Sequence, residues 1–214
     1  MDAAEQAGLG KRSAREGQST MMRTWLLGCT AALAMAGAIL APAQAATCNG
    51  IDFADTAKVG STDLVLNGLG MRKATMFKVD VYVAGLYLPQ KSTDAAAIVA
   101  ANQAWRLELH FVHDADASDI RKAFNDGFET VAGDNLDALQ ARIDALNAQM
   151  IDLKVGDVLI YDYDPATGSV VMLNGKTGPA IEGADFAAAL LEMDIGSKPP
   201  NEELKTGLLG GSCG

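Results

Sequence analysis

Apolar residues recur along this chain with two different periods, and the changes of period predict the order of its elements. Segments with the period-two alternation of β-strands are followed, from residue 117, by segments with the longer period of amphipathic helices. Extended segments are predicted first, at residues 51–53, 63–67, 75–88 and 105–113. Between the last two, Ser92, Thr93 and Asp94 precede an Ala-rich turn of helix that runs to about residue 101.

From residue 117 on, the pattern predicts two helices, then strands, then two more helices. Residues 117–128 and 134–150 carry apolar stripes at helical spacing, and Ser118 is the predicted N-cap of the first of these helices. Two strands joined by an Asp-Pro and Gly turn come next, then a second turn at Asn174 and Gly175. The two turn-linked strands are predicted at 157–162 and 169–174. The remaining predicted elements are a short strand at 179–182 and helices at 186–195 and 201–208.

This order of elements predicts the fold class. Strands that follow one another with short turns pair antiparallel, and runs of strands separated from runs of helices are typical of α+β domains. We expect a large, mainly antiparallel sheet with helices layered on one face.

The N-terminal region predicts export. After Met21 and Met22 comes Arg23, then a run of Ala, Leu, Met, Gly and Ile that closes on Ala43-Gln44-Ala45, the pattern of a secretory signal peptide. We predict cleavage near Ala45, an N-terminal extension and signal peptide over residues 1–45, one domain over 46–214, and a periplasmic or secreted protein. Translation starts at Met1, Met21 or Met22. The apolar run is shorter than the about 20 residues of a membrane span, so no span is predicted after cleavage.

Charge and cysteine content fit an exported domain. The net charge of −10 argues against nucleic acid as a partner. After cleavage only Cys48 and Cys213 remain, one near each end, and an even pair in an oxidising compartment predicts a disulfide between them. The alternative is two free thiols at frayed ends. The oligomeric state is left open.

The most informative segment for function is residues 67–89. Gly68 and Gly70 predict a tight turn that presents Arg72 immediately before the long strand, where a cation would attract an anionic ligand. One face of the strand is predicted to belong to the core. The other face carries Tyr82 and is free to line a cleft. The predicted core face consists of Phe77, Val79, Val81, Val83 and Tyr87, and the other face includes Lys78, Asp80 and Tyr82.

The sequence gives little support for a metal site, a cofactor site or a nucleophilic serine. His110 and His113 are three residues apart on a predicted strand, so they point to opposite faces and do not form a shared metal site. The chain has no phosphate-binding loop, dinucleotide fingerprint or G-x-S-x-G motif. We therefore predict neither a metal nor a cofactor.

Several segments, taken together, resemble the chalcone isomerase superfamily and its exported bacterial members. The resemblance covers nearly all of residues 48–210. It implies an open-faced sandwich with a ligand cleft between sheet and helices. The segments are the Gly68-Leu-Gly-Met-Arg72 motif, the strand end Val83-Ala-Gly-Leu-Tyr87-Leu88, the helix at 119–128, the Lys154-Val-Gly-Asp-Val158 segment, and residues 186–196 followed by Glu203-Leu-Lys205.

The resemblance also implies roles for individual residues. Arg72 occupies the place of the enzyme's anion-stabilising Arg, and Tyr82 the place where fatty-acid-binding members use a Tyr to hold a carboxylate. The enzyme's Tyr and Asn on the first long helix have no match within residues 119–127, and its late Thr falls at Met193. An apolar cleft with one Arg and one Tyr suits binding better than turnover.

The leading prediction is therefore a periplasmic, non-catalytic binding protein for a small apolar acid such as a fatty acid, headed by Arg72 and Tyr82. One alternative is an isomerase or lyase on a chalcone-like enone, with Arg72 as its catalytic residue. Another is a structural or accessory envelope protein. At the level of residues, the alternatives are a salt bridge from Arg72 to Asp80 or Glu108, and ordinary packing for Tyr82.

Overall fold

A computed structural model of the 214-residue chain describes residues 45–74 and 79–213. The predicted signal peptide lies outside these residues, apart from Ala45, and stays a prediction. The first four residues of the predicted strand at 75–88 also lie outside them. In the described part of the chain, no helix combines the length and apolar character needed to cross a bilayer.

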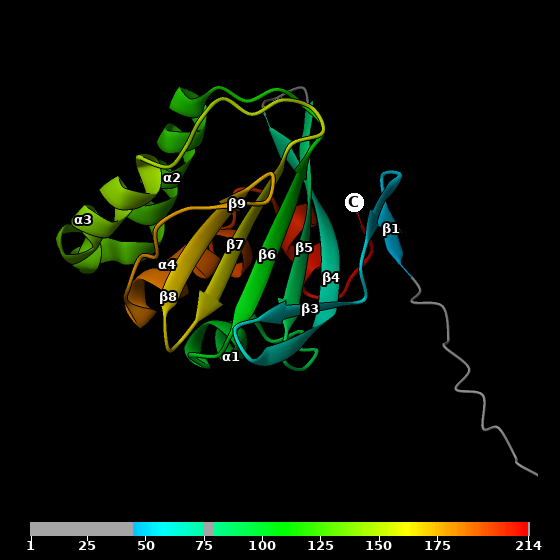
Figure 1. Cartoon of the computed structure of the whole chain (residues 1–214), viewed down its shortest axis with the longest axis horizontal. Coiled ribbons are helices and arrows are strands. Elements are labelled where there is room, and N and C mark those ends of the chain that lie inside the picture. Colours follow the sequence, from blue (N-terminus) through cyan, green and yellow to red (C-terminus); the bar gives the residue numbers. More distant parts are fainter. Residues whose placement is uncertain (1–44, 75–78, 214) are drawn as a thin grey trace, which may run out of the picture. The chain divides into compact units, whose positions relative to one another are not determined.

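Seven antiparallel strands form one sheet whose spatial order is the order of the chain (Figure 1). Each strand pairs with the next one along the chain, although two α-helices lie in the connection between the fourth and fifth strands. The strands are β3 (Thr56–Val59), β4 (Thr62–Ala74), β5 (Val79–Leu88), β6 (Trp105–Phe111), β7 (Val158–Asp164), β8 (Gly168–Leu173) and β9 (Lys176–Thr177). A separate hairpin consists of β1 (Ala46–Cys48) and β2 (Ile51–Phe53).

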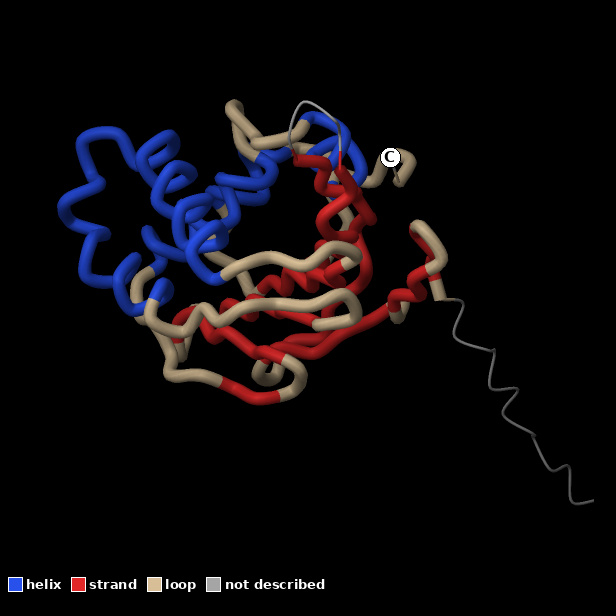
Figure 2. The backbone as a smooth tube through the Cα atoms, turned by 90° about the horizontal axis from the view of Figure 1, so that it is seen from above, coloured by secondary structure: helices blue, strands red, loops and turns tan. Residues whose placement is uncertain are grey.

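The helices gather on one side of the sheet, which curls around them (Figure 2). This arrangement confirms the predicted α+β class with helices layered on one face. The helices are α1 (Ala95–Ala100), α2 (Ala117–Ala132), α3 (Leu136–Asn147), α4 (Ala184–Ile195) and α5 (Glu202–Leu208), with a 3-10 turn at Gly133–Asn135. The predicted strand at 179–182 is reduced to a single bridge between Ile181 and Ser169.

A side chain caps α1 as the sequence predicts, and α2 differs from the prediction. Asp94 is the N-cap of α1, and its carboxylate accepts a hydrogen bond from the Ala97 N–H at 3.0 Å. The prediction that Ser118 caps α2 is wrong, because the helix starts one residue earlier. The Asp152 carboxylate accepts the Ala117 N–H at 2.9 Å, so a residue distant in sequence satisfies that end of the helix.

The predicted glycine turn before Arg72 is also wrong, because Gly68 and Gly70 lie inside β4. Their role is to let the backbone of α5 approach the strand. A Cβ atom on Gly70 would lie 2.4 Å from the Leu204 carbonyl oxygen, and one on Gly68 would lie 2.2 Å from the carbonyl oxygen of Gly207. Only glycine fits this helix-on-strand contact.

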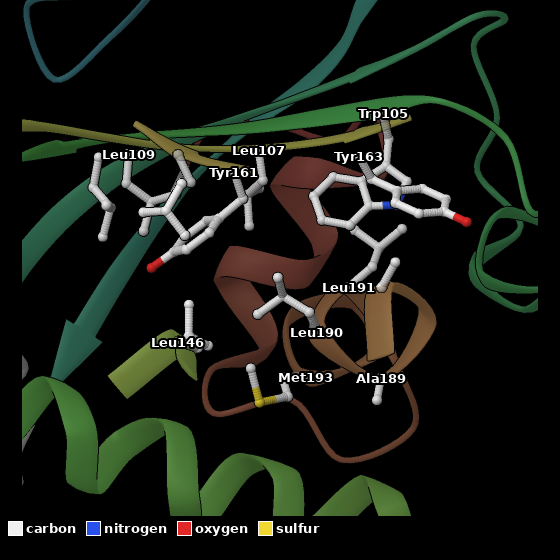
Figure 3. Close-up of a cluster of buried hydrophobic side chains, with 14 of the residues drawn as sticks. Trp105, Leu107, Leu109, Leu146, Tyr161, Tyr163, Ala189, Leu190, Leu191 and Met193 are labelled. Carbon is white, nitrogen blue, oxygen red and sulfur yellow. The ribbon is translucent and has the colours of Figure 1, made fainter. Parts of the chain in front are cut away.

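Both faces of β5 are buried, contrary to the prediction of one core face and one open face. Val83 and Tyr87 belong to a small apolar cluster that also contains Phe53 of β2. Ala84 and Leu86 point the other way, into the main core between sheet and helices, part of which is drawn in Figure 3. Tyr82 is on this second face, at the margin of the main core.

The predicted disulfide between Cys48 and Cys213 is confirmed, with the two Cα atoms 5.8 Å apart. It joins the end of β1 to the segment after α5. Cys48 is buried in the small apolar cluster, and Cys213 packs against it. The bridge therefore holds both ends of the domain on one side of the sheet.

Reduction of this disulfide is expected to destabilise the domain. Closing a loop with a sequence separation of 165 residues restricts the unfolded chain. Loop-entropy arguments set the upper value of that stabilisation at about 5 kcal/mol. Urea unfolding with and without reductant should show the loss, and the Cys48→Ser/Cys213→Ser variant should be as unstable as the reduced protein and insensitive to reductant. Equal stability of the oxidised and reduced wild type would contradict the expectation.

Gly70→Ala is expected to lower the free energy of unfolding by about 3 kcal/mol, because the new methyl group meets the backbone of α5. The matched control is Gly50→Ala, which adds a methyl group in open space and carries only the cost of about 1 kcal/mol for a residue with φ of +76°. Urea unfolding of both variants tests the difference. Equal losses would show that the contact between β4 and α5 is not tight.

Candidate functional site

Arg72 and Tyr82 form a directly facing pair on β4 and β5. Their side chains are hydrogen-bonded to each other, and a second N–H of the guanidinium donates to the carbonyl of Lys73. A guanidinium only donates, so the Tyr82 oxygen is the acceptor in this bond. The Tyr82 O–H is therefore left to donate elsewhere.

The position of Arg72 follows from the contact between β4 and α5. Gly70 faces Ala84 and Arg72 faces Tyr82 in the strand register, so Gly70 and Arg72 lie on the same face of the sheet. α5 covers Gly70, and Arg72 is the next residue along that face. The register shifts directly after Arg72, and a bulge of this kind redirects side chains at the end of a ladder. Both Arg72 and Tyr82 are partly buried.

A third polar group is the hydroxyl of Tyr161 on β7, which interacts electrostatically with Tyr82. Tyr161 is only 2% exposed, and its hydroxyl has no hydrogen-bond partner among the described residues. In Figure 3 this hydroxyl points away from the rings of Trp105 and Tyr163. Burial raises the pKa of Tyr161 well above its usual value, and the fields of Tyr82 and Asp194 raise it further. Tyr161 is therefore a neutral hydroxyl that lacks a partner.

The fourth group is Asp194, in the last turn of α4. Burial raises the pKa of its carboxyl to about 7, and the positive charge of Arg72 lowers it in part. The C-terminal end of a helix carries partial negative charge, an unfavourable neighbour for a carboxylate. Burial, and to a lesser extent the field of Asp194, raise the pKa of Tyr82 as well, while the charge and hydrogen bond of Arg72 lower it in part. The four side chains thus share one electrostatic environment.

The two acidic residues considered as salt-bridge partners of Arg72 have other surroundings. The Glu108 carboxylate lies 2.7 Å from Nε2 of His110. The ring of His110 packs edge-on against the ring of Phe53, a member of the small apolar cluster, with 4.7 Å between the ring centroids. Asp80 is exposed. The contact that Arg72 makes across the strands is with Tyr82.

The region that corresponds to the enzyme's other polar residues is filled by packing. Met193 is 8% exposed, and its sulfur would lie 2.5 Å from a Cβ atom on Gly127 of α2. Asp119 and Asp126, on the same helix, are exposed. Among the described residues, no three His, Cys, Asp or Glu side chains lie close enough together to hold a metal ion. His113 is exposed beyond the end of β6.

Two cavities, of about 380 and 280 Å³, open at the other end of the sheet. Both are lined by Asn102, Tyr163 and Ala184, and neither is lined by Arg72 or Tyr82. The Tyr163 hydroxyl donates to Oδ1 of Asn102 at 2.6 Å. This tyrosine has its own partner, unlike Tyr161 on the same strand.

The sequence predicts Arg72 and Tyr82, and the structure places them together, but it does not predict Tyr161 or Asp194. The alternation of β7 indicates only that Tyr161 points inward. Asp194 carried a clearer signal, since it is an acid near the C-terminal end of the mostly apolar segment 186–195, where the helix dipole disfavours it. Neither signal shows that the two side chains interact electrostatically with Tyr82, because that depends on how α4 crosses the sheet.

Comparisons with known proteins give a family and a related fold. Residues 45–210 match the chalcone isomerase-like family. The crystal structure of a fatty-acid binding protein from Arabidopsis thaliana is similar, with a TM-score of 0.59 and 16% sequence identity over 75% of this chain and 92% of that chain. A search of curated proteins found no significant match. At this identity the likeness to the plant protein shows the fold alone.

The family match spans most of the chain and includes every described strand of the sheet. The likeness to the plant protein supports the same architecture independently. The resemblance inferred from the sequence is therefore confirmed: the chain belongs to the chalcone isomerase-like family.

Proposed function

We propose that this protein binds a small apolar acid, such as a fatty acid, and holds its carboxylate with Arg72 and Tyr82. The observation that carries the proposal is the buried Tyr161 hydroxyl, which has no partner among the described residues and interacts electrostatically with Tyr82, the strand partner of Arg72. The fatty-acid binding protein with the same fold supports it as an analogy.

The polar groups match the chemistry of a carboxylate. Arg72 offers a planar fork of N–H donors, and two tyrosine hydroxyls add single donors. Leaving a buried hydroxyl without a partner costs about 1 to 3 kcal/mol. A ligand oxygen that accepts from Tyr161 would remove this cost, so the free protein is prepared for an acceptor.

Apolar side chains beside the polar head suit an alkyl or aromatic group. The ring of Phe124, on α2, lies edge-on to the ring of Tyr161 at a centroid distance of 6.0 Å. Phe124, Ile120 and Val81 are only partly buried and pack against the main core. We propose that the ligand's apolar part contacts these side chains, where it would cover surface now open to water.

Binding without turnover is the version of this proposal that we favour. Closing a chalcone ring requires a stabilised anion and a route for a proton. Arg72 can supply the first requirement. Met193 and Gly127 pack against each other where the enzyme of this superfamily carries further polar groups.

We also propose that the protein acts in the periplasm or outside the cell. The predicted signal peptide at residues 1–45 supports this location. The disulfide between Cys48 and Cys213 supports it as well, since such bonds persist in oxidising compartments.

Arg72→Gln is expected to weaken the binding of decanoate about 10- to 100-fold, the range for losing hydrogen bonds from a charged donor. Isothermal titration calorimetry on wild type and variant measures the change. Lys73→Gln is the matched control, because it removes the same charge one residue further along β4 and should leave the affinity unchanged. Native mass spectrometry of the purified wild type should show a co-purified acid that the Arg72 variant lacks.

Two outcomes would overturn the proposed function. One is the absence of decanoate binding and of any co-purified acid in the wild type. The other is turnover of a chalcone well above the spontaneous rate that Arg72→Gln abolishes, which would favour the isomerase alternative.

Removing the hydroxyl of Tyr161 is expected to separate stability from binding. Tyr161→Phe eliminates an unpartnered buried hydroxyl, so urea unfolding should show equal or slightly higher stability while decanoate binding weakens about 5- to 10-fold. Tyr163→Phe on the same strand is the control. It loses the hydrogen bond to Asn102, so it should cost about 1 kcal/mol of stability without changing affinity. Unchanged affinity in Tyr161→Phe would exclude Tyr161 from the site.

A further inference from the structure

We propose that the disulfide between Cys48 and Cys213 controls the ligand site: its reduction by a dithiol releases α5 from β4 and weakens the binding of an acid. The inference rests on the proposed function, because it concerns the acid held by Arg72 and Tyr82. It adds a regulator of that site, a dithiol reductant, and it makes affinity depend on the redox state of the two cysteines.

α5 lies on β4 with its first residues toward Arg72. A Cβ atom on Gly68 would lie 2.2 Å from the carbonyl oxygen of Gly207. One on Gly70 would lie 2.4 Å from the carbonyl oxygen of Leu204. An earlier residue of the helix thus meets a later residue of the strand, so the two elements run in opposite directions. Arg72 is the next residue after Gly70 on this face, and a displacement of α5 therefore changes the surroundings of the guanidinium.

α5 also contributes to the core that contains the tyrosines of the proposed site. Its residues Leu204 and Leu208 are fully buried in the main core. Tyr161 belongs to the same cluster of buried residues, and Tyr82 packs against it. Release of α5 would therefore open this core to water and remove part of the apolar surroundings that an alkyl or aromatic group needs.

Asn67 of β4 fixes the last turn of α5 by hydrogen bonds. This side chain is only 6% exposed, and its Nδ2 donates to the carbonyl of Leu208 at 2.7 Å. Nδ2 also donates to the carbonyl of Ser92 at 3.0 Å, and Oδ1 accepts the Ser92 N–H at 2.7 Å. These bonds remain after reduction and oppose the release of α5. We therefore expect a partial loss of binding rather than a complete one.

The chain after α5 crosses to the other face of the sheet, where the disulfide holds it. Cys213 packs against the small apolar cluster that contains Cys48, opposite the face on which α5 lies. Gly210, with φ of +90°, and Gly211 join α5 to this end. A helix of seven residues at a chain end is not stable by itself and needs to be tied down. The disulfide is the covalent tie.

The two sulfurs differ in access to a reductant. Cys48 is 2% exposed, whereas Cys213 is partly exposed and follows the exposed Ser212. A thiolate of the dithiol attacks the sulfur of Cys213, the bond to Cys48 breaks, and the Cys48 thiolate takes up a proton. The second thiol of the reductant then displaces Cys213. The reductant loses two electrons and two protons and becomes a disulfide, and both cysteines end as thiols.

Reduction of the wild type is the direct test. If only the form with α5 in place binds, the apparent dissociation constant is the intrinsic one divided by the fraction in that form. We expect dithiothreitol to raise the dissociation constant for decanoate about tenfold, which corresponds to α5 in place in about one tenth of the reduced molecules. The Cys48→Ser/Cys213→Ser variant should bind like the reduced wild type and should not respond to dithiothreitol.

Hydrogen exchange locates the effect of reduction. Amides of α5 should exchange faster in the reduced protein, while amides of β6, in the centre of the sheet, stay protected. Gly70→Ala should mimic reduction in the oxidised protein, because its methyl group meets the backbone of α5. The matched control is Gly50→Ala, whose methyl group enters open space and should leave the affinity unchanged.

Linkage supplies a readout that a merely structural disulfide would not move. A coupling between redox state and binding is reciprocal, so saturating decanoate should shift the equilibrium with dithiothreitol about tenfold toward the disulfide. Alkylation of free thiols followed by mass spectrometry measures this equilibrium. Arg72→Gln, with its weakened binding, should lose the shift at the same decanoate concentration.

The outcomes separate the two proposals. Decanoate binding that requires Arg72 but is equal in the oxidised and reduced wild type would overturn control by the disulfide and leave the proposed function intact. Absence of decanoate binding in both redox states would overturn both. Loss of protection throughout β6 on reduction would also overturn the inference, because the disulfide would then hold the whole domain rather than α5. The wild-type measurements need no variant, so the inference stays testable if a variant does not fold.

Discussion

The close contact between the backbone of α5 and the glycines of β4 sets the positions of much else in this domain. A helix can approach a strand this closely only where side chains are absent, and Gly68 and Gly70 supply that gap. Leu204 and Leu208 of α5 are fully buried in the main core. The segment after α5 then brings Cys213 to Cys48, so the closure of the domain depends on the same contact.

This contact also explains why α5 does not rest on Arg72. The residue lies on the face of β4 that α5 covers, but beyond the glycines on which the helix rests. Had the helix continued over it, the guanidinium would be enclosed without water or would be displaced from Tyr82. The family feature that places an Arg after two glycines thus has a packing reason as well as a chemical one.

The candidate site combines groups that are individually unfavourable in a protein interior. A buried hydroxyl without a partner and a carboxyl at the negative end of a helix both lower the stability of the free protein. Under the proposed function, a ligand that accepts from Tyr161 would remove the first of these costs. Tyr163, two residues along β7 from Tyr161, shows the contrast, since its hydroxyl has the partner Asn102.

The features predicted correctly are those set by a short segment of the chain, and the feature predicted wrongly depends on packing between segments. The alternation of β6 places Leu107, Leu109 and Phe111 in the core and the residues between them outside it, because a strand's side chains alternate whatever lies above it. The hairpin signals and the cap of α1 were equally local and were confirmed. The glycines before Arg72 were misread as a turn, since glycine serves turns and close contacts alike.

The sequence by itself determined the order of strands and helices, the fold class and the pairing of the terminal cysteines, and it singled out Arg72 and Tyr82 as candidate site residues. These follow from the period of apolar residues, from the count and compartment of the cysteines, and from motifs contiguous in the chain. Only the tertiary structure decided that β5 is covered on both faces from Val83 to Leu88 and that the Tyr161 hydroxyl is buried without a partner among the described residues. Those relations depend on how α4 and α5 cross the sheet, and no periodicity within a single segment encodes a crossing.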